Sequence, residues 1–198
     1  MESANLTLQI LQPRENRWIQ LRQRPVIAWL TGLSGSGKSS LANAADQTLT
    51  AHGRHTMVLD GDNLRVGLNS DLGFSAADRD ENVRRAAEAA ALMAEAGLIV
   101  LVSLISPHRA ERANARRIAR DLSFLEVFVS TPLQVCEARD PKGLYQRARK
   151  GQIPEFTGVS APYEPPCGPD LTIVTEGRSI TDSAQPLVDA LLRLSKLP

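Results

Sequence analysis

The most constraining feature of the 198-residue sequence is the segment GLSGSGKS at residues 32–39. It matches the pattern G-x-x-x-x-G-K-S/T, follows the apolar run 26–30, and precedes helical periodicity over 38–52. Glycines let backbone N–H groups curl around phosphates, and the N-terminus of the following helix adds its dipole. The segment therefore predicts a nucleotide phosphate loop, formed by Gly32, Leu33, Ser34, Gly35, Ser36, Gly37, Lys38, Ser39 and Ser40.

Two side chains of this loop are expected to touch the nucleotide directly. Lys38 is predicted to reach the β- and γ-phosphates, and the Ser39 hydroxyl is predicted to hold Mg²⁺. Ser40 follows, but the spacing assigns the metal role to Ser39. The guanine signature Asn-Lys-x-Asp is missing from the sequence, so ATP is favoured over GTP. A glycine-rich turn without a ligand is the alternative, and the strand–loop–helix context argues against it.

The rest of the chain alternates between strand-like and helix-like segments. This alternation predicts an α/β fold, a P-loop NTPase-type doubly wound sheet of about five parallel strands with helices on both faces. Ligands of such sheets bind beyond the carboxyl ends of the strands. Strands are expected at 26–30, 55–60, 98–105, 124–129 and 170–175, and helices at 38–52, 75–96, 107–122, 132–139, 145–150 and 181–194.

Composition shifts suggest the domain boundaries. Residues 1–24 are polar and weakly patterned, and are expected to form an N-terminal arm or a short hairpin. Residues 25–198 are expected to form one P-loop domain. Within it, residues 139–169 are predicted to form a lid and substrate loop, because the proline-rich stretch 152–169 is too long for an ordinary connection.

Composition also excludes several classes of function. The net charge of +1 provides no basic field for nucleic acid, and the chain contains no apolar run long enough for a membrane span. The first residues lack the pattern of a signal peptide. Cys136 and Cys167 are the only cysteines, too few for a disulfide framework. A cytoplasmic protein with reduced thiols is expected.

Polar side chains with candidate chemistry follow the second and third expected strands. Asp60 and Asp62 end the second strand, where one carboxylate can assist Mg²⁺ and the other can accept a proton from a hydroxyl; an Asx-turn is the alternative. Ser106 and Pro107 follow the third strand and suit the start of a helix, and Ser106 also faces the ligand edge.

Two further groups can recognise a nucleotide substrate. Arg65, Arg79 and Asn82 come after the acidic turn, and a guanidinium binds a sulfate or phosphate through two hydrogen bonds. Phe74 and Phe156 lie in glycine-containing loops. The two rings can sandwich a purine, or each can pack its own loop onto the core; their spacing leaves both readings open.

At this point the sequence resembles the adenylylsulfate kinase family. The matching segments are GLSGSGKSS, LDGDNLR, DLGFSAADRDENVRRAAEAA, GLIVLVSLISPHRAER, FLEVFVSTPLQVCEARDPKGLYQRARKG and FTGVSAPYEPP, in the family's order between about residues 26 and 166. The resemblance implies a P-loop kinase that uses ATP and Mg²⁺ to phosphorylate the 3′-hydroxyl of adenosine 5′-phosphosulfate. It also implies a homodimer and suggests a functional link to ATP sulfurylase.

The resemblance implies a role for each matching residue. Asp62 would be the base, with Asp60 supporting it, and Lys142 would approach the transferred phosphate. Arg139 would lie near the nucleotide. Ser106 corresponds to a serine described in the family as a phosphoserine, although direct transfer needs no such intermediate. The remaining substrate contacts would come from Arg65, Phe74, Arg79, Asn82, Ile105 and Phe156.

The sequence departs from the family pattern at a few positions, and it leaves two alternative functions to be tested. Ser40 stands where threonine is frequent, Val102-Ser103-Leu104 replaces Thr-Ala-Phe, and Gln146 replaces a basic residue. One alternative is a P-loop kinase for another small hydroxylated metabolite. The other is a catalytically silent nucleotide-binding partner of ATP sulfurylase, which the intact Lys38 and Asp62 disfavour.

Overall fold

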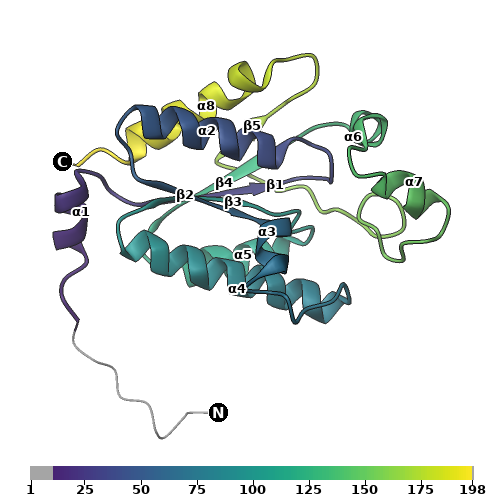
Figure 1. The fold of residues 1–198 in the computed structure, drawn as a ribbon, viewed down its shortest axis with the longest axis horizontal. Coiled ribbons are helices and arrows are strands. Elements are labelled where there is room, and N and C mark those ends of the chain that lie inside the picture. Colours follow the sequence, from purple (N-terminus) through teal and green to yellow (C-terminus); the bar gives the residue numbers. More distant parts are fainter. Residues whose placement is uncertain (1–10, 198) are drawn as a thin grey trace, which may run out of the picture.

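The computed structural model describes residues 11–197 of the chain. A five-stranded sheet lies between layers of helices, and its neighbouring strands all run parallel (Figure 1). The strand order is β2-β3-β1-β4-β5, which confirms the predicted α/β class. The strands are β1 (Val26–Thr31), β2 (Thr56–Asp60), β3 (Ile99–Ser103), β4 (Ser123–Val129) and β5 (Leu171–Ile173).

The helices cover both faces of the sheet, as predicted, and two of them were not foreseen. The unforeseen helices are α1 and α3. The described helices are α1 (Glu15–Leu21), α2 (Lys38–Ala51), α3 (Gly61–Val66), α4 (Ala76–Glu95), α5 (Arg109–Ile118), α6 (Leu133–Arg139), α7 (Leu144–Arg149) and α8 (Ile180–Leu194).

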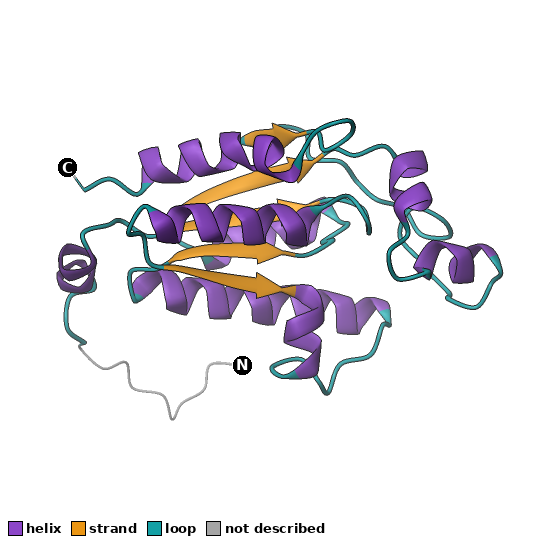
Figure 2. Cartoon of the chain, turned by 45° about the horizontal axis from the view of Figure 1, so that its top comes forward, coloured by secondary structure: helices purple, strands orange, loops and turns teal. Residues whose placement is uncertain are grey.

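The central strand β1 separates two apolar cores. Val26, Ala28 and Leu30 pack with α2 and α8 on one face. Ile27 and Trp29 pack with α4 and α5 on the other face. All the residues of β1 are buried, as expected for a parallel strand covered on both sides. The chain therefore has a three-layer structure, which Figure 2 shows with the strands between the helices.

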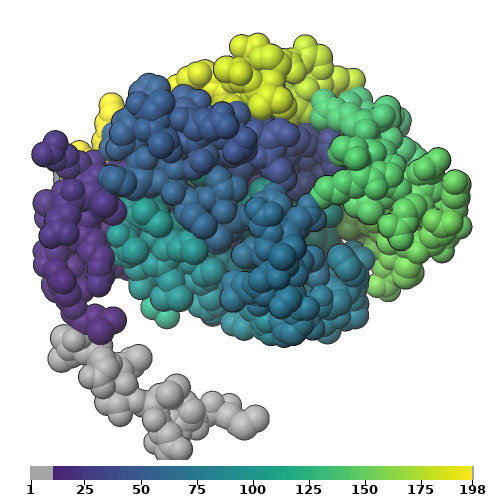
Figure 3. All heavy atoms as spheres, in the orientation of Figure 1, coloured from purple at the N-terminus to yellow at the C-terminus, as the bar shows by residue number. Residues whose placement is uncertain are grey.

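The carboxyl ends of all five strands face one edge of the sheet, and the arrowheads in Figure 2 point that way. Helices α6 and α7 lie beyond this edge, within the expected lid segment 139–169 and its approach. Cys136, Tyr145, Ala148 and Phe156 form a small apolar core there, separate from the two cores of the sheet. In Figure 3 this green segment forms the end of the molecule opposite the purple N-terminal helix.

An arm or a short hairpin was expected for residues 1–24, but the described part of this segment contains the helix α1. Residues 1–10 lie outside the described part of the chain. Trp18 on α1 donates its indole N–H to the carbonyl of Glu95 at 3.2 Å. The fully buried Gln23 donates to the carbonyls of His55 and Gly97, at 2.9 and 2.8 Å. This segment therefore closes the amino edge of the sheet.

Two predicted helix starts had different outcomes. Ser75 caps α4 by accepting a hydrogen bond from the N–H of Asp78, and Gly97 adopts a positive φ of 103° after the helix, both as predicted. The prediction that Ser106 caps the next helix is wrong: α5 begins at Arg109, and His108 is its N-cap. Glu111 accepts a hydrogen bond from the His108 N–H, which makes the later start favourable.

Candidate active site

The phosphate loop connects β1 to α2 and depends on its glycines. Gly35 and Gly37 have φ values of 73° and 101°, in the left-handed region that favours glycine. A Cβ atom at Gly32 would lie 2.6 Å from the carbonyl oxygen of Val129. The loop therefore holds a tight curve at the N-terminus of a 14-residue helix, a geometry that binds phosphate.

Lys38 is buried inside this loop. Its Nζ donates to the carbonyl of Leu33 at 2.8 Å, and only 8% of the residue is exposed. Burial lowers its pKa from 10.5 to about 8. The ammonium group lacks a strong counter-charge in this state, so an anion entering the loop would stabilise its charged form.

Ser39 and Asp60 meet at the carboxyl ends of the strands. The Ser39 hydroxyl donates to Asp60 Oδ2 at 2.5 Å and lies 3.2 Å from the hydroxyl of Ser103. Asp60 Oδ1 also accepts the N–H of Asp62 at 3.0 Å and thereby caps α3. Asp60 thus makes the turn proposed as the alternative and also lies at the phosphate loop.

Asp62 forms an ion pair with Lys142. Asp62 lies on α3, whereas Lys142 lies on the connection between α6 and α7. Both side chains are more than half exposed. The lid segment thus contacts the acidic turn directly, and the structure brings together two residues that are separated by 80 positions in sequence.

Arg65, Phe74 and Arg79 form a second cluster near this edge. The Arg65 guanidinium lies 4.4 Å from the centre of the Phe74 ring. Arg79 donates to the carbonyl of Phe74 at 2.9 Å. Burial, followed by the neighbouring Arg79 charge, lowers the pKa of Arg65. The ring of Phe74 is 68% exposed, so one of its faces is available to a base.

Two other predicted substrate residues have different surroundings. Asn82 is buried, and its Oδ1 accepts a hydrogen bond from Asn69 at 3.0 Å. Phe156 is buried and packs edge-on against Tyr145, with ring centres 5.1 Å apart. Within residues 11–197, Phe74 and Phe156 do not form a stacked pair. For Phe156 the structure favours the alternative in which the ring packs its own loop.

Ile105 and Ser106 follow β3 in the chain and form hydrogen bonds with residues of β1. The hydroxyl of Ser106 accepts the indole N–H of Trp29 at 3.0 Å, and Ser106 is 2% exposed. Its φ is 37°, an unfavourable region for serine that suits a tight turn. Thr31 donates its hydroxyl to the carbonyl of Ile105 at 2.7 Å. The Ser106 hydroxyl is thus part of the core on the α4 and α5 face.

Arg139 and Tyr145 connect the segment 139–169 to the phosphate loop and to Thr175, and Thr131 and Thr175 bind the loop from beyond β4 and β5. The sequence patterns did not predict Thr131, Tyr145 or Thr175. Arg139 donates to the hydroxyl and the carbonyl of Thr175, at 2.9 and 3.0 Å. Thr131 and Thr175 both donate to the carbonyl of Ser36, at 3.0 and 2.9 Å. The Tyr145 hydroxyl donates to the carbonyl of Ser34 at 2.9 Å. The threonines come just after β4 and β5, and this position was the available signal.

A cavity of about 300 Å³ opens beside Arg79, between α4, α5 and the proline-rich loop. It is lined by Ala76, Arg79, Asp80, His108, Glu111, Glu155, Ser160, Ala161 and Pro162.

In the described part of the chain, no helix is both long and apolar enough to cross a bilayer.

A phosphate loop between β1 and α2 of a parallel sheet, with acidic residues after β2, defines a P-loop kinase. Comparison with known families narrows this class, because the model of the family described as adenylylsulphate kinase matches residues 24–174. The chain belongs to the adenylylsulphate kinase family.

Individual relatives agree with this family. Adenylyl-sulfate kinase of Shewanella pealeana is 54% identical over 90% of this chain and 87% of its own length. Bifunctional enzyme NodQ of Rhizobium sp. (strain N33) is 59% identical over 85% of this chain, but the chain spans only 26% of that protein. The structure of the Mycobacterium tuberculosis APS kinase CysC in complex with AMPPNP and APS has a TM-score of 0.82 and 53% identity, and the match covers 86% of this chain and 98% of that one.

Proposed function

We propose that the chain is an adenylylsulfate kinase, which transfers the γ-phosphate of ATP to the 3′-hydroxyl of adenosine 5′-phosphosulfate and makes 3′-phosphoadenosine 5′-phosphosulfate. One observation carries the proposal: the Ser39–Asp60 contact and the Asp62–Lys142 ion pair lie together beside the phosphate loop. The M. tuberculosis relative, solved with AMPPNP and APS, supports the assignment of both substrates.

ATP would bind with its phosphates in the loop formed by residues 32–39. The buried ammonium of Lys38 would approach the β- and γ-phosphates and gain the counter-charge that it lacks. The hydrogen bonds of Tyr145 and Arg139 to the loop carbonyls keep the lid attached while the nucleotide enters. ATP binding and phosphate transfer would thus both use the loop formed by residues 32–39.

Ser39 and Asp60 fit a magnesium ion. Both side chains offer oxygen, the ligand atom that Mg²⁺ prefers, and the hydrogen bond between them places both oxygens beside the phosphate loop. Mg²⁺ usually takes only one or two protein ligands and completes its shell with phosphates and water. When bound, the ion would neutralise charge on the transferred phosphate. Ser103 contacts Ser39 and would help to fix its side chain.

Asp62 is the proposed base. Its carboxylate would accept the proton of the 3′-hydroxyl as that oxygen attacks the γ-phosphorus. Lys142, now paired with Asp62, would be in position to neutralise charge on the transferred phosphate. The two side chains come from α3 and from the expected lid, and their contact brings both sides of the proposed site together.

Arg65 and Arg79 would bind the phosphosulfate, and the exposed ring of Phe74 would stack on the adenine. Phe156 would have to leave Tyr145 to reach the other face of the base. Asn82, held by Asn69, would support the helix that carries Arg79. The side chains that would need the least rearrangement to bind the substrate therefore come from α3 and the start of α4.

An assay of purified protein tests the proposal. ADP release should require both adenosine 5′-phosphosulfate and Mg²⁺, and the product should carry the new phosphate on the 3′-oxygen. A panel of other hydroxylated metabolites separates the alternative kinase functions. ATP binding without turnover on any of them would instead support the silent nucleotide-binding partner.

The proposal extends to assembly. A homodimer is proposed for this chain, and light scattering of the purified protein tests it: a mass of one chain would contradict it. The proposed link to ATP sulfurylase is tested by measuring whether adding that enzyme changes the kinase rate at limiting adenosine 5′-phosphosulfate. An unchanged rate and separate elution on a sizing column would contradict the link.

A further inference from the structure

Glu111 on α5 has a buried carboxyl group whose two oxygens have different surroundings. Oε2 accepts the backbone N–H of His108 at 3.2 Å. Oε1 is buried, and no donor among residues 11–197 reaches it. An ionised carboxylate oxygen that is buried without a hydrogen-bond donor is unfavourable. The protonation of Glu111 is therefore decided by its neighbours.

The neighbour that matters is Asp80 on α4, which lines the same cavity as Glu111. Two ionised carboxylates cannot hydrogen-bond to each other, so a hydrogen bond between these two groups requires a proton on one of them. Glu111 is 8% exposed whereas Asp80 is exposed, so the charge is more costly on Glu111. Burial and the Asp80 carboxylate raise the pKa of Glu111 to about 7.

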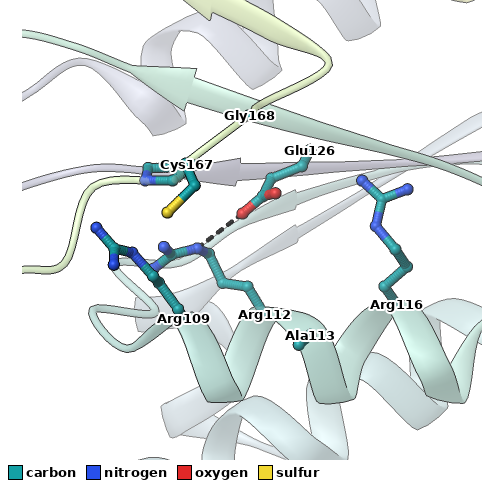
Figure 4. A pocket seen from close by; sticks show the side chains of 8 residues that line it. Arg109, Arg112, Ala113, Arg116, Glu126, Cys167 and Gly168 are labelled. Atoms are coloured by element: carbon teal, nitrogen blue, oxygen red, sulfur yellow. Dashed lines mark hydrogen bonds and ion pairs between the residues drawn. The ribbon is translucent and has the colours of Figure 1, made fainter.

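The pair lies between two helices that carry arginines of the substrate region. Asp80 directly follows Arg79, which lines the same cavity. Glu111 directly precedes Arg112, whose buried guanidinium donates to the carbonyls of Ser106 and Glu164, both at 2.7 Å. The guanidinium also donates to Glu126 Oε1 at 2.8 Å, the hydrogen bond that Figure 4 shows. A hydrogen bond between Asp80 and Glu111 would therefore connect α4 to the turn after β3.

We propose that Glu111 is a positioning residue for the substrate site: its protonated carboxyl group donates to Asp80 and holds α4, with Arg79, against α5. The inference rests on the proposed function, because Arg79 is assigned there to the phosphosulfate. Loss of the proton places two negative charges in contact, which separates the helices and adds negative charge beside an anionic ligand. Other charged groups here are Arg79 on α4, His108 before α5, and Glu155 and Glu164 on the loop.

The first test measures the KM for adenosine 5′-phosphosulfate against pH. In the unmodified protein KM should rise on the order of three- to tenfold from about pH 6.5 to about pH 8.5, as Glu111 loses its proton. Glu111→Gln keeps a donor at all pH values, so its KM should change less than about twofold over this range. Glu88→Gln, an exposed change on α4, is the matched control and should keep the unmodified profile.

The second test needs no substrate, so it separates failure of this inference from failure of the proposed function. Carbon NMR of the glutamate side-chain carboxyls should show one signal that titrates near pH 7, and Glu111→Gln should remove that signal. Asp80→Asn, a change at an exposed site, should move its titration well below 7, because the new amide donates to an ionised Glu111. A Glu111 signal that titrates near 4.5 in the unmodified protein, or one unmoved by Asp80→Asn, overturns the proposal.

Discussion

The two edges of the sheet are built in opposite ways. At the amino edge, the buried amide of Gln23 satisfies the backbone of His55 and Gly97, and α1 covers the strand ends. At the carboxyl edge, Lys38 is buried without a strong counter-charge, and Asp62 and Phe74 are exposed. At the amino edge Gln23 completes backbone hydrogen bonds within the chain, whereas the carboxyl edge leaves groups for a ligand to complete. We infer that the amino edge serves stability and the carboxyl edge serves chemistry.

The largest expected effect tests the carboxyl edge. Asp62→Asn removes the proposed base and should lower kcat by roughly 10³-fold. Because Asp62 is exposed and its ion pair with Lys142 contributes little to stability, the melting temperature should change by less than about 2 °C. Turnover and thermal unfolding measure the two effects. A variant with near-normal kcat would contradict the assignment of Asp62 as the base.

A substitution at the amino edge should lower stability and leave turnover unchanged. Gln23→Ala leaves the N–H of His55 and the carbonyl of Gly97 unpaired and removes one of two donors to the His55 carbonyl, and should lower the free energy of unfolding by about 3 kcal/mol. Turnover per folded molecule should stay unchanged. Denaturant unfolding measures the loss, with exposed Gln20→Ala on α1 as the matched control. If Gln23→Ala impaired turnover more than stability, the contrast between the edges would be wrong.

A substitution of Ser106 should lower stability, and its effect on turnover tests whether Ser106 has a covalent role. Ser106→Ala leaves the buried indole N–H of Trp29 without an acceptor and should lower the free energy of unfolding by about 2 kcal/mol. If phosphate passes directly between the substrates, kcat should remain within about threefold of the unmodified value. Loss of turnover in folded Ser106→Ala protein would instead favour a covalent role.

The smallest effect concerns Lys38 and pH. Its folded-state pKa of about 8 is below its ordinary value of 10.5, so Lys38 loses its proton above about pH 8 in the free protein. ATP affinity should then weaken by roughly tenfold per pH unit at most, because a neutral amine attracts phosphate less. Between about pH 8 and 10.5 the unfolded chain binds more protons, so this group makes stability rise with pH. Lys38→Arg should remove both trends in calorimetry and thermal unfolding.

The repeating elements could be predicted because their signals are local. Helix α4 begins at Ser75 and ends before Gly97, as the capping residues indicate. The short helices α1 and α3 were missed because they bury few of their own residues and have weak periodicity. Ser106 was misassigned because serine followed by proline suits a helix start, whereas the reciprocal hydrogen bond of Glu111 favours a start at Arg109.

The sequence by itself determined the phosphate-loop motif and the parallel α/β fold, and it singled out Lys38, Ser39, Asp60 and Asp62 as candidates, because each of these signals depends on residue type and short-range spacing. Only the tertiary structure decided which distant side chains meet. Asp62 pairs with Lys142, the phosphate loop is held by Thr131, Thr175 and Tyr145, and Glu111 lines one cavity with Asp80. Such contacts depend on how the helices and loops pack on the sheet, which residue type and short-range spacing do not specify.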